Sequence, residues 1–160
     1  MPLPKLREYL DSHNIKYMVI SHSVAYTAQG IAALVHLSGK KLAKTVILKI
    51  DGVLAMAVVP ASLHVDLELI RETAGASLVE IATEQEFRDA FPDCETGAMP
   101  PFGNLYDIPV YADDSLAEYE EITFNAGTHR ELMRMNWADM VRLVNPVITR
   151  LSHRPAAIPV

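Results

Sequence analysis

The segment Lys44–Pro60, KTVILKIDGVLAMAVVP, constrains the fold more than any other stretch of the chain. Its centre, Asp51-Gly52, is a favoured two-residue turn, and apolar runs rich in β-branched residues flank it on both sides. This pattern predicts a β-hairpin. The second arm, Val53–Val59, is apolar at positions that face both sides of a strand. Strands of this kind are buried on both faces, so we expect the second arm to lie centrally in its sheet.

Further helices and strands are predicted on both sides of this hairpin. Apolar periodicity and capping residues predict helices over residues 4–12, 27–36, 63–74, 84–90 and 137–144. Among the caps, Thr83 and Glu86 form a capping box, and Asn136 precedes the last helix. Further strands are predicted over residues 17–21, 77–82, 108–112, 122–126 and 131–135. A strand-rich centre mixed with helices indicates an α+β or mixed α/β fold, with helices around a mixed sheet.

Length and composition fit one domain over residues 1–160. Residues 149–160 show little pattern, so we expect a tail that is loose or packed against a partner. The single cysteine, Cys94, excludes an internal disulfide framework and fits a reducing compartment. No apolar run approaches the length of a membrane span, and the N-terminus lacks the apolar core of a signal peptide. We therefore expect a soluble, cytoplasmic protein without membrane contact.

The charge distribution limits the partners of the chain. A net charge of −6 disfavours broad binding to a nucleic-acid backbone. Residues 50–129 hold most of the acids, whereas residues 40–49 hold four of the six lysines. This basic patch could receive one small anionic target, such as one end of a nucleic acid. A solvated charged turn explains Lys40 and Lys41 equally well.

Common cofactor and metal motifs do not fit the sequence. Gly39-Lys40 lacks the remaining residues of a phosphate-binding loop, and no glycine-rich dinucleotide motif or nucleophile elbow is present. The six histidines are scattered without the spacing of a helical zinc site, and Cys94 has no cysteine partner. We therefore expect neither a metal nor a cofactor, and we expect Cys94 to be a small buried or loop residue.

The segment Gly97–Gly103, GAMPPFG, predicts a rigid and irregular loop. Each proline fixes its own φ and pushes the preceding residue out of the helical region, so the segment fits neither a helix nor a central strand. Its remaining N–H groups, on Gly97, Ala98, Met99, Phe102 and Gly103, need hydrogen-bond partners. Such a loop could hold a carbonyl or an oxyanion. A plain proline-rich connection is the alternative.

Two strands carry polar residues of interest. Lys44 shares the more apolar face of the first hairpin arm, so we expect it to point inward and Lys49 to point outward. An inward lysine needs an anion, a carbonyl or a pocket, unless it lies at a frayed strand start and reaches water. Polar residues also alternate along an expected strand over 123–129, which ends in His129. That face could line a pocket or face solvent.

Three stretches, AKTVIL, GAMPPFG and FNAGTH, occur in an order and spacing that resemble the YbaK/prolyl-tRNA-synthetase-associated domain family. The resemblance spans roughly residues 3–146 and includes TAQGIAAL and AMAVVPA. Members of this family are aminoacyl-tRNA deacylases, either free-standing or inserted into prolyl-tRNA synthetase. The resemblance implies a barrel-like mixed sheet surrounded by helices, with a pocket for a mischarged aminoacyl end.

The resemblance also implies roles for individual residues. Lys44 matches the family's essential lysine, and Gly97 matches the glycine of the loop that lies against the aminoacyl carbonyl. His129 looks like the histidine that alanine-editing members carry near the amino acid, and free-standing cysteine-editing members usually lack it. We therefore expect a trans-editing deacylase for Ala-tRNA(Pro), with a different small amino acid as the alternative. The expected substrate contacts are Ala98, Met99, Pro100, Pro101, Phe102, Gly103, Asn125, Gly127 and Thr128.

The chemistry of an aminoacyl ester suits these residues, because attack by water on an activated ester needs positioning and oxyanion stabilisation more than a strong side-chain nucleophile. The expected partners are the 3′-aminoacyl end of a mischarged tRNA and prolyl-tRNA synthetase. One alternative is a non-catalytic module of the same fold that binds tRNA ends or a small ligand. Another is hydrolysis of a small ester or thioester, which the absence of a triad signature disfavours.

Overall fold

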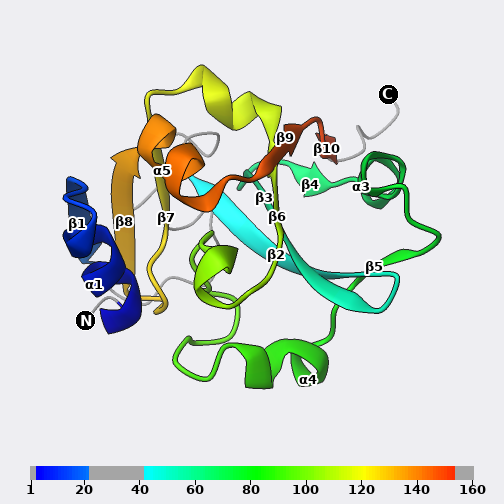
Figure 1. The fold of residues 1–160 in the computed structure, drawn as a ribbon, viewed down its shortest axis with the longest axis horizontal. Helices are drawn as coiled ribbons and strands as arrows, with labels where there is room; N and C mark the ends of the chain where they lie inside the picture. Colours follow the sequence, from blue (N-terminus) through cyan, green and yellow to red (C-terminus); the bar gives the residue numbers. More distant parts are fainter. Residues whose placement is uncertain (1–2, 22–41, 154–160) are drawn as a thin grey trace, which may run out of the picture.

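A computed structural model describes residues 3–21 and 42–153 of the chain (Figure 1). The helix predicted over residues 27–36 lies outside these described residues. The described α-helices are α1 (Pro4–Ser12), α3 (Leu67–Ala74), α4 (Glu84–Phe87) and α5 (Trp137–Val144). Short 3-10 helices are η1 (Arg88–Ala90), η2 (Gly103–Leu105) and η3 (Asp114–Glu118). The strands are β1 (Tyr17–Ser21), β2 (Ala43–Ile50), β3 (Val53–Pro60), β4 (His64–Val65), β5 (Val79–Ile81), β6 (Val110–Asp113), β7 (Glu121–Asn125), β8 (Glu131–Asn136), β9 (Val147–Thr149) and β10 (Ser152–His153).

The largest sheet has five strands in the order β5-β2-β3-β6-β9. The predicted hairpin is confirmed as β2 and β3, which are antiparallel and turn at Asp51 and Gly52, both with positive φ. The central position of β3 is also confirmed, because it pairs with β2 on one side and β6 on the other. Since β3–β6 and β6–β9 are parallel, the sheet is mixed, and the chain has the α+β fold expected from the sequence.

The expected barrel-like closure is wrong for the described strands, which form three separate sheets. A second sheet has the order β1-β8-β7, and β10 pairs with β4 in a third. A single parallel bridge between Leu42 and Thr123 is the described link between the first two sheets. Apart from that bridge, the two sheets contact each other through apolar side chains that pack in a shared core. Their strands therefore do not form one closed barrel.

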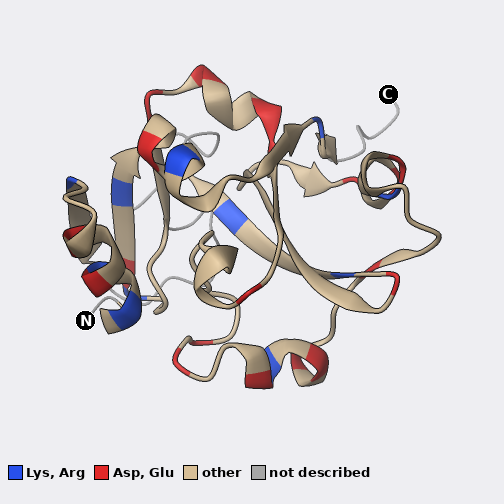
Figure 2. Cartoon of the chain, viewed as in Figure 1, with Lys and Arg blue, Asp and Glu red and all other residues tan. Residues whose placement is uncertain are grey.

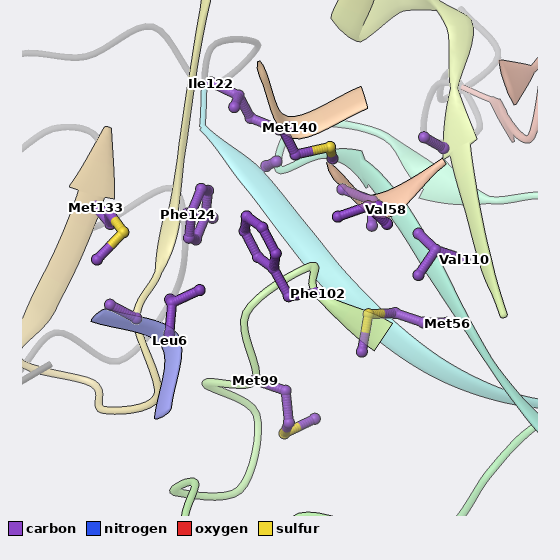
Figure 3. Close-up of a cluster of buried hydrophobic side chains, with 14 of the residues drawn as sticks. Leu6, Met56, Val58, Met99, Phe102, Val110, Ile122, Phe124, Met133 and Met140 are labelled. Carbon is purple, nitrogen blue, oxygen red and sulfur yellow. The ribbon is translucent and has the colours of Figure 1, made fainter. Parts of the chain in front are cut away.

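The main hydrophobic core lies between the five-stranded sheet and the β1-β8-β7 sheet (Figure 3). Met56 and Val58 come from β3, and Phe124 and Met133 come from the second sheet. A smaller core covers the opposite face of the hairpin, where Leu48, Ala57 and Val59 pack with Ile70 of α3 and with Leu151. Strands β2 and β3 are therefore covered on both faces.

Coverage of both faces corrects the expectation that Lys49 points outward into solvent, because Lys49 is half-buried, as is Lys44. The Lys49 ammonium reaches two carboxylates, forming an ion pair with Glu86 and another with Glu80 at 3.5 Å. Its side chain is only 24% exposed, because α4 and β5 lie beside it. Neither face of β2 is open to solvent along its length.

Two predicted capping interactions are confirmed. Thr83 and Glu86 form the predicted capping box, and the Asn136 side chain caps α5 by accepting the Ala138 N–H at 2.9 Å. The helix predicted from residue 63 begins only at Leu67, because His64 and Val65 pair with β10. The expected loose tail is wrong for Thr149 to His153, which includes strand residues; residues 154–160 lie outside the described part. Among the described helices, none combines the length and apolar character needed to cross a membrane.

Candidate active site

The turn between β7 and β8, residues 126–130, carries His129. The predicted strand over 123–129 is wrong beyond Asn125, where β7 ends. Gly127 has a φ of +94°, which is incompatible with a continuing strand. Within the turn, the Thr128 hydroxyl accepts the Arg130 N–H at 3.3 Å. His129 therefore projects from a turn, and the expected polar strand face does not exist, since Thr123 is buried.

The N-terminal segment braces this turn. The Leu3 N–H donates to the Ala126 carbonyl at 2.9 Å, and a Cβ placed on Gly127 would lie 2.9 Å from the Leu3 Cβ. Gly127 was expected to allow the close approach of a ligand or of a backbone. The structure places Leu3 of the same chain there, so Gly127 serves to pack the turn against α1.

The loop Gly97–Gly103 is held by its buried side chains. The Phe102 ring is fully buried, with its centroid 5.8 Å from that of Phe124 and 6.3 Å from that of Tyr9, and Met99 lies in the same core (Figure 3). Pro100 and Pro101 are buried as well. These side chains anchor the loop, so a ligand could meet Met99 and Phe102 only through their backbone.

The two loops meet through backbone hydrogen bonds. The Glu95 N–H donates to the Gly127 carbonyl and the Gly127 N–H to the Ala98 carbonyl, both at 2.9 Å. Gly97 is exposed, has a φ of +83° and lies against His129, since a Cβ at Gly97 would be 3.5 Å from the His129 Cε1. The structure thus brings together Gly97 and His129, which lie on separate segments of the sequence.

Several N–H groups of the first loop are available. The Ala98 N–H donates to the Glu95 carbonyl at 3.0 Å. By contrast, the N–H groups of Gly97, Met99, Phe102 and Gly103 donate no hydrogen bond to any residue within 3–21 or 42–153. Unused backbone donors beside an exposed glycine are the groups that stabilise a developing oxyanion in acyl transfer.

His129 is fixed at both its backbone and its ring. The His129 N–H donates to the Glu95 Oε1 at 3.2 Å, and the ring Nε2 lies 2.6 Å from the Thr96 carbonyl oxygen. In turn, the Thr96 hydroxyl donates to Glu84 Oε1 at 3.2 Å. Sequence reasoning missed Glu95 and Thr96, because the contacts join positions that are remote in the chain and no local pattern marks them.

Lys44 lies near this region but not in contact with it. The bridge from Leu42 to Thr123 sets the start of β2 beside β7, the strand that leads to the His129 turn. Lys44 makes no hydrogen bond or ion pair with any residue that the structure describes, and burial lowers the pKa of its ammonium. At the end of β7, the Asn125 Oδ1 is buried and likewise has no partner among these residues. The structure records no contact of Lys44 with Gly97 or His129.

The environment of Cys94 opposes a nucleophilic role. Its sulfur lies 3.3 Å from the Tyr106 hydroxyl, and burial raises the pKa of the thiol to about 11. Since the thiolate is the nucleophile, a raised pKa disfavours covalent chemistry there. Within the described ranges, no group of three or more histidine, cysteine or acidic side chains is placed to hold a metal ion.

Comparisons with known proteins converge on one family. Residues 22–143 match the aminoacyl-tRNA editing domain. The chain is 29% identical over 87 residues to the proline–tRNA ligases of Bacillus mycoides (strain KBAB4) and Bacillus cereus (strain AH187). These matches cover 54% of this chain but only 15% of each ligase.

Two solved structures have a similar fold. A hypothetical protein has a TM-score of 0.85 at 20% identity, over 93% of this chain and 99% of its own. A candidate trans-editing enzyme for prolyl-tRNA synthetase has a TM-score of 0.81 at 22% identity, over 93% of this chain and 95% of its own.

Proposed function

The chain belongs to the aminoacyl-tRNA editing domain family, and on this premise we propose that it is an aminoacyl-tRNA deacylase acting in trans. The observation that carries the proposal is that Gly97 lies against His129, in a loop whose Gly97, Met99, Phe102 and Gly103 N–H groups have no acceptor among the described residues. We propose alanyl-tRNA(Pro) as the preferred substrate, which the similarity to proline–tRNA ligases supports. Translation takes place in the cytoplasm, and we place the activity there.

The proposed reaction is hydrolysis of the ester between the amino acid and the terminal ribose. Water attacks the ester carbonyl, and free N–H groups of Gly97–Gly103 bind the oxygen as it becomes negative. A neighbouring ribose hydroxyl of the substrate or a backbone carbonyl orients the water by accepting its hydrogen bond. The water oxygen bonds to the acyl carbon, the ester C–O bond breaks, and the proton of the water ends on the ribose oxygen, which leaves as a hydroxyl. The loop is rigid, because Phe102 and Met99 anchor it in the core, so its donors need little reorganisation during the reaction.

Lys44 is proposed to bind the terminal adenosine phosphate or otherwise hold the substrate. It is half-buried and has no anionic partner among the described residues, which leaves its ammonium free for a phosphate. Asn125, Thr128 and the backbone of Ala98 to Gly103 remain proposed contacts of the aminoacyl end. The stiff Pro100-Pro101-Phe102 turn backs a shallow pocket that accepts alanine and rejects proline, as the second sieve of an editing site does. Prolyl-tRNA synthetase is the proposed partner that supplies the mischarged tRNA.

A panel of mischarged tRNAs tests this function. Alanine, serine and cysteine on tRNA(Pro), and alanine on other tRNAs, are incubated with the protein, and release of the amino acid is measured. We expect the fastest release from Ala-tRNA(Pro). Release from none, at concentrations where a known deacylase works, would leave a tRNA-end or small-ligand binding module of the same fold.

Two substitutions connect the activity to the site. We expect Gly97→Ala to lower kcat/KM by about 100-fold, because alanine is strained at this φ and its methyl group would lie against His129. Loss of a charge-assisted contact in Lys44→Ala is expected to lower kcat/KM by about 10- to 100-fold, chiefly through KM. If both variants retain the wild-type rate, the site assignment is wrong.

A further inference from the structure

The surroundings of His129 determine which of its ring nitrogens carries a proton. The Thr96 carbonyl oxygen, 2.6 Å from Nε2, can only accept a hydrogen bond. The Nε2 must therefore be the protonated nitrogen, and in the neutral ring the Nδ1 is then an acceptor. No described residue forms a hydrogen bond with Nδ1. The turn thus presents one free acceptor on an otherwise fixed ring.

Glu95 supports this arrangement from two directions. Its Oε1 accepts the His129 N–H at 3.2 Å, and its own N–H donates to the Gly127 carbonyl at 2.9 Å. The next residue, Thr96, supplies the carbonyl that holds the ring, and its hydroxyl is tied to Glu84 of α4. The segment Glu95-Thr96 is therefore hydrogen-bonded to residues 127 and 129 of the turn, and it is itself hydrogen-bonded to α4.

We propose that Glu95 is a positioning residue, and that Glu95 and the Thr96 carbonyl together fix His129 in the Nε2–H tautomer with Nδ1 as an acceptor for the α-amino group of the substrate. An amino group donates hydrogen bonds, whereas the ester carbonyl only accepts them. The ribose hydroxyl beside the ester can also donate, but it is present in every acyl ester of the same tRNA, with or without an amino group. A fixed acceptor beside Gly97 therefore suits the α-amino group, the donor that distinguishes an aminoacyl ester from an acyl ester without an amine. This inference rests on the proposed deacylase function and names how its site recognises the amine.

Gly97 and Glu95, two residues apart in the chain, both contact His129 but in different ways. Gly97 lies beside the ring, since a Cβ there would be in van der Waals contact with Cε1 at 3.5 Å, and its φ of +83° is one that a side chain would strain. Glu95 holds the backbone of His129, from which the ring projects. Without the Glu95 carboxylate the His129 N–H loses its acceptor, the turn gains freedom, and the contact of the ring with Thr96 weakens.

The test compares two esters on the same tRNA, one alanyl and one propionyl, which lacks only the amino group. We expect Glu95→Ala and His129→Ala each to lower kcat/KM for the alanyl ester by about 10- to 100-fold, the effect of a lost hydrogen bond to a charged group. Both variants should change kcat/KM for the propionyl ester less than threefold. Glu95→Gln keeps the acceptor Oε1 and should restore the alanyl rate. Glu72→Ala, an exposed glutamate on α3, is the matched control.

A second measurement reads the ring directly. Nitrogen-15 NMR of histidine-labelled protein should show His129 as the Nε2–H tautomer in the wild type, in Glu95→Gln and in Glu72→Ala, and as a mixture of tautomers in Glu95→Ala. Equal losses on both esters, or an Nδ1–H tautomer in the wild type, would overturn the inference while leaving the deacylase function intact. If the wild type releases no amino acid from any ester, the proposed function fails instead, and the tautomer result still decides the role of Glu95.

Discussion

At the scale of single residues, the structure assigns different tasks to the glycines of the site. Gly97 is exposed and lies against His129, whereas Gly127 packs against Leu3 and uses both of its backbone polar groups within the protein. Both have positive φ, so sequence reasoning could expect a glycine requirement at each. The sequence could not show what each glycine contacts, because those contacts depend on segments that approach from elsewhere in the chain.

His129 shows a second limit at this scale. Its importance was expected from a family resemblance, but its placement on a strand face was wrong, because Gly127 ends the extended backbone. Glu95 offered no sequence signal at all. It is one of many acids in an acidic stretch, and its contact with His129 arises only when the two loops meet.

The titration of Cys94 gives a prediction at the residue scale. Burial raises the pKa of its thiol from an ordinary value of 9.0 to about 11. At pH 8 we therefore expect iodoacetamide to modify the native protein much more slowly than the unfolded protein, with the native rate rising as pH approaches 11.

The same shift predicts the direction of the pH dependence of stability. Between about pH 9 and 11 the native state holds a proton that the unfolded chain has lost, so the free energy of unfolding should fall as pH rises through this window. Cys94→Ala should remove this component from the stability profile. A native alkylation rate equal to the unfolded rate at pH 8 would contradict the burial of the thiol.

At the scale of elements, helix caps and the β2–β3 hairpin were predicted from local sequence, whereas the pairing of strands distant in the chain was not. The caps of α4 and α5 are local interactions, so Thr83 and Asn136 could be identified from their neighbours in sequence. The pairing of β4 with β10 joins distant residues in short strands. Such strands carry too few residues for a recognisable pattern, and β4 was therefore read as the start of a helix.

The turn of the β2–β3 hairpin gives a prediction at this scale. Asp51 has positive φ, and its Oδ1 accepts the N–H groups of Ser77 and Leu78 at 3.0 and 2.8 Å, which ties the turn to the segment before β5. Asp51→Ala should lower the free energy of unfolding by about 1–2 kcal/mol, because it adds strain and leaves two backbone donors without their acceptor.

Asn is the matched replacement at this turn, since it tolerates positive φ and keeps an Oδ1 acceptor. We therefore expect Asp51→Asn to retain most of the stability in urea denaturation. Equal destabilisation by Ala and Asn would mean that the carboxylate charge, and not the hydrogen bonds, holds the turn. Neither variant should change kcat/KM for deacylation, because the turn is at the far end of β2 from Leu42 and Lys44.

At the scale of the whole molecule, the charges are unevenly distributed. Figure 2 shows acidic residues spread over α4 and η3, and basic residues on β2 and β8. With a net charge of −6, long-range attraction of tRNA is weak, and a small number of local contacts must determine binding. The open arrangement of sheets was not predicted, because closure depends on how strand edges meet, and the sequence of each strand does not specify its neighbour.

Salt dependence tests whether Lys44 contributes one such contact. Each phosphate contact in a single-stranded nucleic acid adds about 0.7 to the steepness of log affinity against log salt concentration. We expect the plot of log kcat/KM for Ala-tRNA(Pro) to be less steep by about 0.7 in Lys44→Gln than in the wild type.

Lys49→Gln is the control for this measurement, because Lys49 lies on the same strand and is also half-buried, but it is paired with Glu86 and Glu80. Its salt dependence should equal that of the wild type. An unchanged slope in Lys44→Gln would remove the phosphate role from Lys44 and leave it as a positioning group.

The pairing of β1 with β8 has a consequence for synthesis on the ribosome. Strand β1 is made early, but its partner, residues 131–136, is made more than 100 residues later, as is Ala126, which receives the Leu3 N–H. A nascent chain therefore carries β1 before the strand that pairs with it exists. Met18 and Val19 of β1 are exposed even in the folded protein. The contacts that brace the His129 turn likewise need residues 126–129, so the site can form only after the segments from Leu3 to His129 have all been made.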